Sequence, residues 1–189
     1  MTLKLWQKRP KLHFSKDIID IVQFGSSVIE GKSPNDIDIA VIFNKIPVKD
    51  QLNQAQKIKE DLKKIIKIPV HIKAFDFYSL FNKANFSKDN IILYGRSLIS
   101  GDYFSNYFGF KPKILIKYYL RGLKKKDKVR FNYSLNGKKG KYGMLKNYGG
   151  KILSPGLIEI EPEFEEIFIN SMKKITAKIE VIKILKHDM

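Results

Sequence analysis

The sequence predicts an α/β (α+β) fold, in which a mixed sheet is followed by a smaller basic α/β region. Short runs rich in Ile and Val end at glycine or proline, as buried strands do. Between Val48 and Lys67, apolar residues recur every three or four positions, which indicates an amphipathic helix. Lys, Gly and Tyr become frequent after residue 100, so we expect one domain over residues 1–100 and a basic region over 101–189.

Turn formers divide residues 1–100 into alternating strands and helices. We expect strands at 18–24, 36–43, 70–77 and 91–94, and helices at 26–30, 48–67 and 78–84. The long helix should end before Pro69, which cannot continue it. It should bury its apolar positions, which are Leu52, Ala55, Ile58, Leu62, Ile65 and Ile66.

The basic region should contain two helices and two strands around a stretch dominated by Lys, Gly, Tyr and Asn. The expected elements are helices at 112–123 and 162–174 and strands at 157–160 and 179–185. The inward residues should be Ile114, Leu115, Tyr118 and Tyr119 in the first helix, and Phe164, Ile167 and Phe168 in the second.

Composition excludes several classes of protein. With 43% hydrophobic residues among 189, the chain can bury a core and is not globally disordered. Because it has no cysteine, disulfides, thiol nucleophiles and Cys-based zinc sites are excluded. No apolar stretch approaches the ~20 residues of a membrane span. We therefore expect a soluble, cytoplasmic protein that does not associate with membranes.

The net charge of +17, from 36 Lys and Arg against 19 Asp and Glu, favours an anionic partner such as a nucleotide or a nucleic acid. The alternative is that an AT-rich genome enriches Lys, Ile and Asn together. Composition alone leaves these two explanations open.

Asp36 and Asp38 open the second apolar strand, and their spacing places both carboxylates on one face. Adjacent carboxylates repel each other unless a positive group lies between them. Mg²⁺ meets that need, because it prefers carboxylate oxygens and substrate phosphates as ligands. Two solvated loop aspartates are the structural alternative.

Gly25 and Ser26 follow the first strand and lie ten residues before this pair. A glycine there allows a tight turn and the close approach of a phosphate. The serine hydroxyl and neighbouring backbone N–H groups can then bind that phosphate.

Phe24-Gly25-Ser26 followed by Asp36-Ile37-Asp38-Ile39 resembles the signature of the DNA polymerase beta-type nucleotidyltransferase superfamily. The resemblance covers about residues 15–100, and it is nearest to the minimal prokaryotic and archaeal branch, some members of which are antitoxins that nucleotidylate a partner protein. It implies the mixed-sheet nucleotidyltransferase fold, Mg²⁺ or Mn²⁺ held by Asp36 and Asp38, and an NTP substrate, with ATP expected. The nucleotidyl acceptor would be a nucleic acid or a protein.

A third carboxylate normally completes the family's site, and the aligned position here is His71. His71 could replace it as the general base, the base could be lost, or Asp76 could supply it. The loop departs from the minimal branch too, since the Arg of its Ala-Arg-Gly motif is absent. Lys32 is the candidate phosphate-binding residue in its place.

The basic region supplies a candidate nucleic-acid surface with interleaved aromatics for base stacking. Its central residues are Lys124, Lys125, Lys126, Lys128, Arg130, Lys138, Lys139 and Lys141. A solvated lysine-rich surface is the structural alternative, and a protein partner with acidic residues fits equally well.

Overall fold

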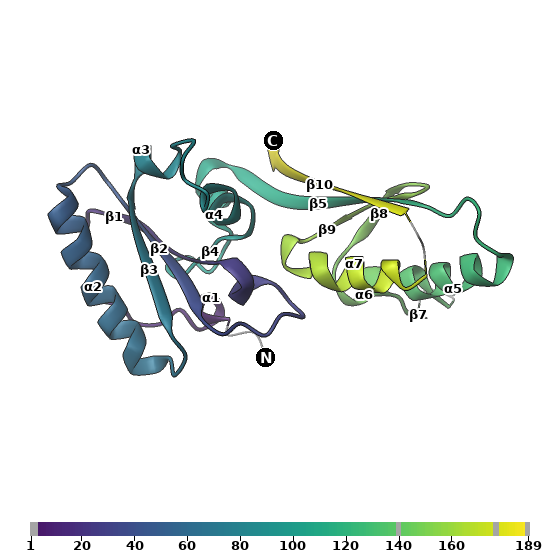
Figure 1. Ribbon diagram of the computed structural model, residues 1–189, viewed down its shortest axis with the longest axis horizontal. Helices are drawn as coiled ribbons and strands as arrows, with labels where there is room; N and C mark the ends of the chain where they lie inside the picture. The colour runs from purple at the N-terminus through teal and green to yellow at the C-terminus, as the bar shows by residue number, and fades with distance from the viewer. Residues whose placement is uncertain (1–3, 139–140, 176–177, 188–189) are drawn as a thin grey trace. The chain divides into compact units, whose positions relative to one another are not determined.

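The computed structural model describes residues 4–138, 141–175 and 178–187 and divides the chain into two compact units (Figure 1). The first unit extends to Lys111 and the second spans Pro112–His187, whereas the sequence places the boundary at residue 100. The difference has a physical cause. Phe104 is 1% exposed in the core of the first unit, and Phe108 packs against that core. The rise in Lys and Gly content therefore begins before the first core ends.

A four-stranded mixed sheet forms the centre of the first unit. Its strands are β1 Ile18–Phe24, β2 Ile37–Phe43, β3 Val70–Asp76 and β4 Arg96–Ser97. They are ordered β3-β2-β1-β4, with β1 antiparallel to β2 and β4, and β2 parallel to β3. The predicted α+β class is confirmed at this level, as are the strands expected at 18–24, 36–43 and 70–77 within one residue at their ends.

Helices cover both faces of this sheet, which explains why β2 reads as a continuous apolar run. The short elements α3 Phe77–Leu80, α4 Lys88–Tyr94 and η2 Phe104–Phe108 contribute to one core. Its buried members are Val22, Phe24, Ala40, Ile42, Leu80, Ile91 and Phe104. The long helix α2, Val48–Ile65, packs along β3 and lies beside the sheet in Figure 1.

The buried stripe of α2 differs in part from the predicted one. Ala55, Ile58 and Leu62 are buried, but Leu52 is 58% exposed and Ile65 is 55% exposed. The stripe continues towards the N-terminus through Gln51, whose Nε2 donates to the Ile46 carbonyl at 3.0 Å. Gln51, whose side chain has a backbone hydrogen-bond partner, therefore takes the place in the buried stripe that the periodicity assigned to Leu52.

The second unit is a four-stranded sheet with helices on one face (Figure 1). Its strands are β5 Phe110–Tyr119, β8 Lys151–Ser154, β9 Leu157–Ile160 and β10 Lys178–His187. Its helical elements are α5 Lys125–Asn136, α6 Met144–Asn147, η3 Pro162–Phe164 and α7 Glu165–Lys173, and β6 Gly137–Lys138 pairs with β7 Lys141–Tyr142. Apart from that hairpin and α6, the order β-α-β-β-α-β in a sheet ordered β10-β5-β9-β8 is the split βαβ arrangement of ferredoxin-like folds.

Two predicted elements are wrong. Residues 112–123 do not form a helix, because Ile114 and Ile116 are buried on one face of β5 while Leu115 lies on the other. The stretch at 91–94 is the end of α4 rather than a strand, and Ile91 and Tyr94 are buried three residues apart, on one helix face. A run of four apolar residues has no period that separates the two states.

Three further expectations can be compared with the structure. Strands at 157–160 and 179–185 are confirmed by β9 and β10, and α7 buries Phe168 as expected, together with Met172. Phe164 and Ile167 are only partly buried. Within the described residues, no helix is long and apolar enough to cross a membrane.

Candidate functional site

Strand register brings three of the predicted site residues together at the start of β2 and β3. Asp38 lies directly opposite His71 on the neighbouring parallel strand, and Asp36 immediately precedes β2. The His71 Nδ1 is 3.2 Å from Asp36 Oδ2 and 3.9 Å from Asp38 Oδ1. All three side chains are accessible, with Asp38 30%, Asp36 36% and His71 60% exposed. The imidazole of His71 therefore occupies a position beside Asp36 and Asp38 at which a third carboxylate would add further repulsion.

The turn after β1 lies against the same carboxylates. Phe24 pairs with Asp38 across the antiparallel strands, so Gly25 begins the turn η1, Gly25–Val28, beside the Asp38 side chain. Gly25 has φ +76°, and a Cβ added to it would lie 2.6 Å from Asp38 Oδ2. Glycine is required here by both backbone conformation and space.

The two serines of the turn have different roles. Ser27 is buried, and its hydroxyl accepts from Gln23 Nε2 at 3.0 Å and donates to the Phe24 carbonyl at 3.1 Å. These bonds fix the turn. Ser26 is half-buried beside Gly25, which leaves it as the serine of this turn nearer to a ligand on the carboxylates.

The electrostatics of the site centre on Asp38. Burial raises the pKa of its carboxyl group, and the negative charge of Asp36 raises it further. The positive charges of Lys73 and His71 act in the opposite direction. Burial and the Asp36 charge thus both oppose ionisation of Asp38, and a bound cation would favour it.

Lys73 is a site residue that the sequence reasoning missed. It lies two residues after His71 on β3, so both side chains are on the same face of the sheet. Its Nζ donates to Ser87 Oγ at 2.7 Å and lies 5.8 Å from the centre of the Phe24 ring. The period-two alternation of the predicted strand was the signal that could have identified it.

Lys32, the lysine that the sequence suggested for phosphate binding, is exposed on the loop between η1 and β2. Asp76 lies at the other end of β3, opposite Phe43. Its carboxylate caps α3 by accepting the Ser79 N–H at 2.7 Å. Asp76 is thus five positions along the strand from His71, a separation of about 16 Å at ~3.3 Å per residue.

The donor set suits a hard cation only in part. Asp36 and Asp38 offer the carboxylate oxygens that Mg²⁺ prefers, and Mg²⁺ commonly completes its shell with water and phosphate oxygens. Across residues 4–138, 141–175 and 178–187, no group of three or more His, Cys, Asp or Glu side chains is arranged to hold a metal. Any metal here would depend on ligands from its substrate.

The predicted basic residues gather on α5 and the β6–β7 hairpin of the second unit. Those that the structure describes are all exposed: Lys124, Lys125, Lys126, Lys128, Arg130, Lys138 and Lys141. Lys139 lies outside the described residues. In the described part of the chain, none of the seven forms an ion pair with an acidic side chain.

Lysines on the sheet of the same unit are paired instead. Lys151 and Lys186 lie 3.0 and 3.7 Å from the buried Glu159 carboxylate, and Lys117 lies 3.9 Å from Glu180. Lys113 contacts Glu161. The exposed cations of α5 and its hairpin therefore differ from these lysines, because no acidic side chain among the described residues pairs with them.

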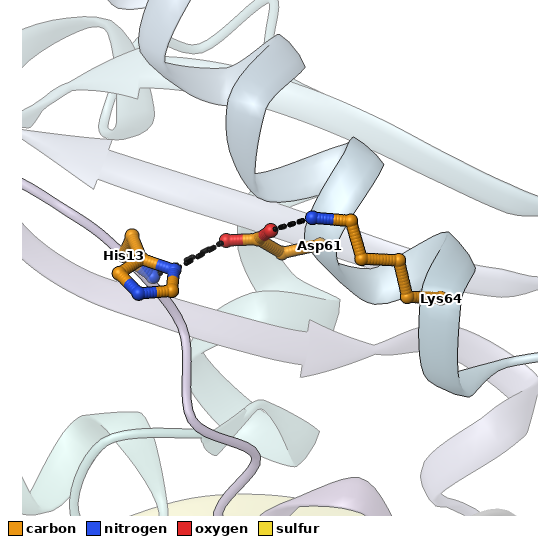
Figure 2. A network of polar contacts seen from close by, with 3 residues as sticks. All are labelled: His13, Asp61 and Lys64. Atoms are coloured by element: carbon orange, nitrogen blue, oxygen red, sulfur yellow. Dashed lines mark hydrogen bonds and ion pairs between the residues drawn. The ribbon is translucent and has the colours of Figure 1, made fainter.

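A separate polar network joins the N-terminal segment to α2, as Figure 2 shows. The Asp61 carboxylate contacts His13 Nδ1 at 3.1 Å and Lys64 Nζ at 2.7 Å. These bonds, the one from Lys64 foremost, lower the pKa of Asp61 to about 2. His13 is thus a surface residue whose ring contacts Asp61.

The geometry unites the Gly25 turn, the Asp36–Asp38 pair, His71 and Lys73 at one end of the first sheet. Comparison with known proteins places no further constraint on the site: no protein-family model and no curated protein matches this chain.

Proposed function

We propose that the first unit is a Mg²⁺-dependent nucleotidyltransferase of the DNA polymerase beta-type superfamily, on the minimal prokaryotic pattern. The observation that carries the proposal is the close approach of Gly25 to the Asp38 carboxylate, opposite His71. A turn that can admit phosphate and a pair of carboxylates that can hold a cation are both needed to bind a nucleoside triphosphate with its metal. ATP is the expected nucleotide.

Different residues of the chain would bind the metal and the phosphates. Asp36 and Asp38 would hold Mg²⁺ or Mn²⁺, which supplies charge stabilisation to the attacking and leaving oxygens. The backbone of Gly25 and the Ser26 hydroxyl would contact the phosphates. The Lys73 ammonium group would offset negative charge on the same face, a role that the sequence had assigned to Lys32.

In the proposed reaction, an acceptor hydroxyl oxygen attacks the α-phosphorus of the nucleotide. A new P–O bond forms, the bond between the α-phosphorus and its bridging oxygen breaks, and pyrophosphate leaves. His71 is the candidate for the proton of the attacking hydroxyl. With Nδ1 directed at Asp36, its Nε2 has no hydrogen-bond partner among the described residues and can accept that proton as a general base.

Transfer of label from α-labelled NTPs tests the proposal, with Mg²⁺ or Mn²⁺ and with RNA, DNA and protein acceptors. The Asp36→Asn/Asp38→Asn variant should transfer no label. The matched control is Asp50→Asn/Asp89→Asn, which removes two charges from exposed positions of the same unit and should retain transfer. Label transfer that survives in the first variant, or that is absent from the unaltered protein with every nucleotide and acceptor, would contradict catalysis at this site.

A second candidate function is nucleic-acid binding by the basic surface of α5, with or without catalysis in the first unit. The observation that favours it is the contrast between the α5 cations, which lack acidic partners among the described residues, and the paired lysines of the adjoining sheet. Tyr133 and Tyr142 are 51% and 82% exposed, and aromatic side chains of this kind stack on bases.

Salt dependence of binding tests this second function. Affinity for duplex DNA should fall with salt at a log–log slope of about −0.9 per neutralised phosphate. Replacing Lys125, Lys126, Lys128 and Arg130 by Gln should make the slope shallower by about 3 to 4. A control variant replaces Lys49, Lys57, Lys59 and Lys63 on α2 by Gln, which removes the same amount of charge. This variant should leave the slope nearly unchanged. Equal effects of both variants would show that net charge, and not this surface, governs binding.

A further inference from the structure

A cavity lined by polar and aromatic residues lies in the first unit, and the proposed transfer reaction does not use it. It has a volume of about 310 Å³, close to the lower end of ligand pockets, which span about 300–1,000 Å³. Asp20 and Ser97 line it beside the aromatic residues Phe104 and Tyr107, and the exposed residues Asp102 and Asn106 also line it.

Asp20 is an uncommon residue for such a position, because it is a carboxylate only 6% exposed. Its Oδ1 accepts the Ile21 N–H and the Ser97 hydroxyl, both at 2.7 Å. Both hydrogen bonds that described residues give to this carboxylate end on Oδ1, and no ion pair with a described cation involves it. Oδ2 thus accepts no hydrogen bond from the described residues, and Asp20 lines the cavity.

The wall beside Asp20 is held in place before any ligand arrives. The Ser97 hydroxyl that donates to Asp20 also accepts the N–H groups of Ile99 and Ser100 at 3.1 and 2.9 Å. The Ser97 N–H in turn donates to the Asp102 carbonyl at 2.8 Å. One hydroxyl thus organises the loop around the buried carboxylate, and a ligand would find the cavity already shaped.

The neighbouring charges leave the carboxylate without a cation of its own. The Arg96 guanidinium group stacks on Tyr103, 3.5 Å from the ring centre. Arg9 lies against the loop, with its Nε 2.9 Å from the place of a Cβ on Gly101, and Asp102 adds a further acid at the exposed part of the cavity. No charged neighbour contributes to the rise in the pKa of Asp20, which burial causes.

We propose that this cavity binds the protonated amine of a small organic ligand, with the ammonium group on the Asp20 carboxylate and its carbon chain against Tyr107. A single buried carboxylate with hydroxyl and aromatic neighbours fits an ammonium ion, which hydrogen-bonds oxygen and is attracted to ring faces. Asp20 is the one buried carboxylate of the cavity lining, fewer acidic ligands than the Asp36–Asp38 pair offers a metal, whereas one carboxylate is enough to pair with an ammonium group.

The amine site is distinct from the proposed nucleotide site. Asp20 pairs with Ile42 and Phe24 pairs with Asp38, so the two carboxylates are four positions apart, about 13 Å at ~3.3 Å per residue. The packed core that contains Val22, Ala40 and Phe104 lies on the same face of the sheet. Amine binding therefore does not depend on nucleotidyl transfer, and the failure of one proposal leaves the other intact.

Amide chemical shifts of the full chain, measured at pH 7.5 during titration with butylammonium, test the inference. We expect saturable shifts at Ile21, Ile99, Ser100 and Asp102, and none at these amides with 1-butanol, which has the same carbon chain without the charge. The Asp20→Asn variant should bind butylammonium at least tenfold more weakly. An Asp50→Asn control should bind it normally.

Three results would overturn the inference: equal shifts with 1-butanol, unchanged affinity in Asp20→Asn, or saturable shifts confined to other regions. The variant should stay folded, because an asparagine carbonyl can accept the same two hydrogen bonds, and its melting curve checks this. Affinity should also fall between pH 7.5 and pH 5, since burial raises the pKa of Asp20 to about 6 and the ligand needs the charged form.

Discussion

Asp20 and Asp38 lie on the same face of one sheet, and burial raises the pKa of both, yet their surroundings differ. Asp38 is at an open end with a second carboxylate, an imidazole and a lysine nearby. Asp20 is enclosed, and a hydroxyl and a backbone N–H are its hydrogen-bond donors among the described residues. The open site has several charged groups close together, whereas the cavity has one buried carboxylate, with Asp102 at its exposed part.

Where several charged groups lie together, as around Asp38, a bound ligand can replace one group as the partner of another. An isolated buried charge, such as that of Asp20, lowers stability until a ligand pairs with it. The first arrangement suits a reaction in which charge moves during each turnover. The second suits selective binding, since a neutral ligand of the same shape gains nothing from the carboxylate.

The largest effect should come from His71→Ala, which removes the imidazole from the open site. If His71 accepts the proton of the attacking hydroxyl, label transfer should fall about a thousandfold, the middle of the range for general-base catalysis. Because His71 is 60% exposed, the free energy of unfolding should hardly change. An Asp76→Ala control should retain transfer. If the two variants transfer label equally well, then His71 is not the base.

The next effect should come from Asp20→Asn, which removes the isolated charge from the enclosed site. The folded-state pKa of about 6 is above the ordinary 3.8, so the native protein binds the proton more tightly than the unfolded chain. The contribution of Asp20 to stability should thus be greatest below pH 4 and fall as the pH rises towards 6. Above that, the charge costs about 3 kcal/mol, at ~1.4 kcal/mol per pKa unit.

Denaturant unfolding at pH 4 and pH 8 measures this difference. The free energy of unfolding of Asp20→Asn should equal that of the unaltered protein at pH 4. At pH 8 it should be higher, by at most about 3 kcal/mol. A variant that is less stable at pH 8 would mean that the Asp20 charge has a partner that stabilises it. Gain of stability with loss of amine binding is the pattern expected of a functional carboxylate.

These two sites also differ in how far the sequence reveals them. The Gly25-Ser26 turn and the Asp36–Asp38 pair are local patterns, so spacing alone predicts them. That His71 faces them depends on the parallel register of β2 and β3, in which Asp38 pairs with His71. The sequence could align His71 with a missing carboxylate but could not give its distance from the pair. Lys73 required the same register and was missed.

The amine cavity could not be predicted, because its parts are distant in the chain. Asp20 is one of two polar residues in an otherwise apolar strand, and its partner Ser97 is 77 residues away. In the fold, β1 and β2 were predictable because both are apolar and buried on both faces. β5 was not, since Leu115 interrupts its alternation of lysine and isoleucine and makes the run resemble a helix.

A smaller effect is expected from Gly25→Ala, which tests whether the turn must approach the Asp38 carboxylate. An alanine at φ +76° is strained, and its Cβ would lie 2.6 Å from Asp38 Oδ2. We expect a loss of about 2 kcal/mol in unfolding free energy and weaker NTP binding. Gly122→Ala is the matched control, because Gly122 has φ +86° with nothing within 4 Å of an added Cβ. If the two variants lose the same stability, backbone strain alone accounts for the effect.

The smallest effect should come from Asp61→Asn, which removes an aspartate whose two hydrogen-bond partners are largely exposed. Its pKa is lowered to about 2, so its contribution to stability is present above the ordinary value and is lost as the pH falls towards 2. Because His13 and Lys64 are 83% and 73% exposed, water and salt screen the network. The melting temperature should change less than in Asp20→Asn, and the change should shrink in 1 M salt. A loss as large as the gain in Asp20→Asn would contradict the view that burial, more than the number of charged neighbours, sets the energetic weight of an aspartate in this protein.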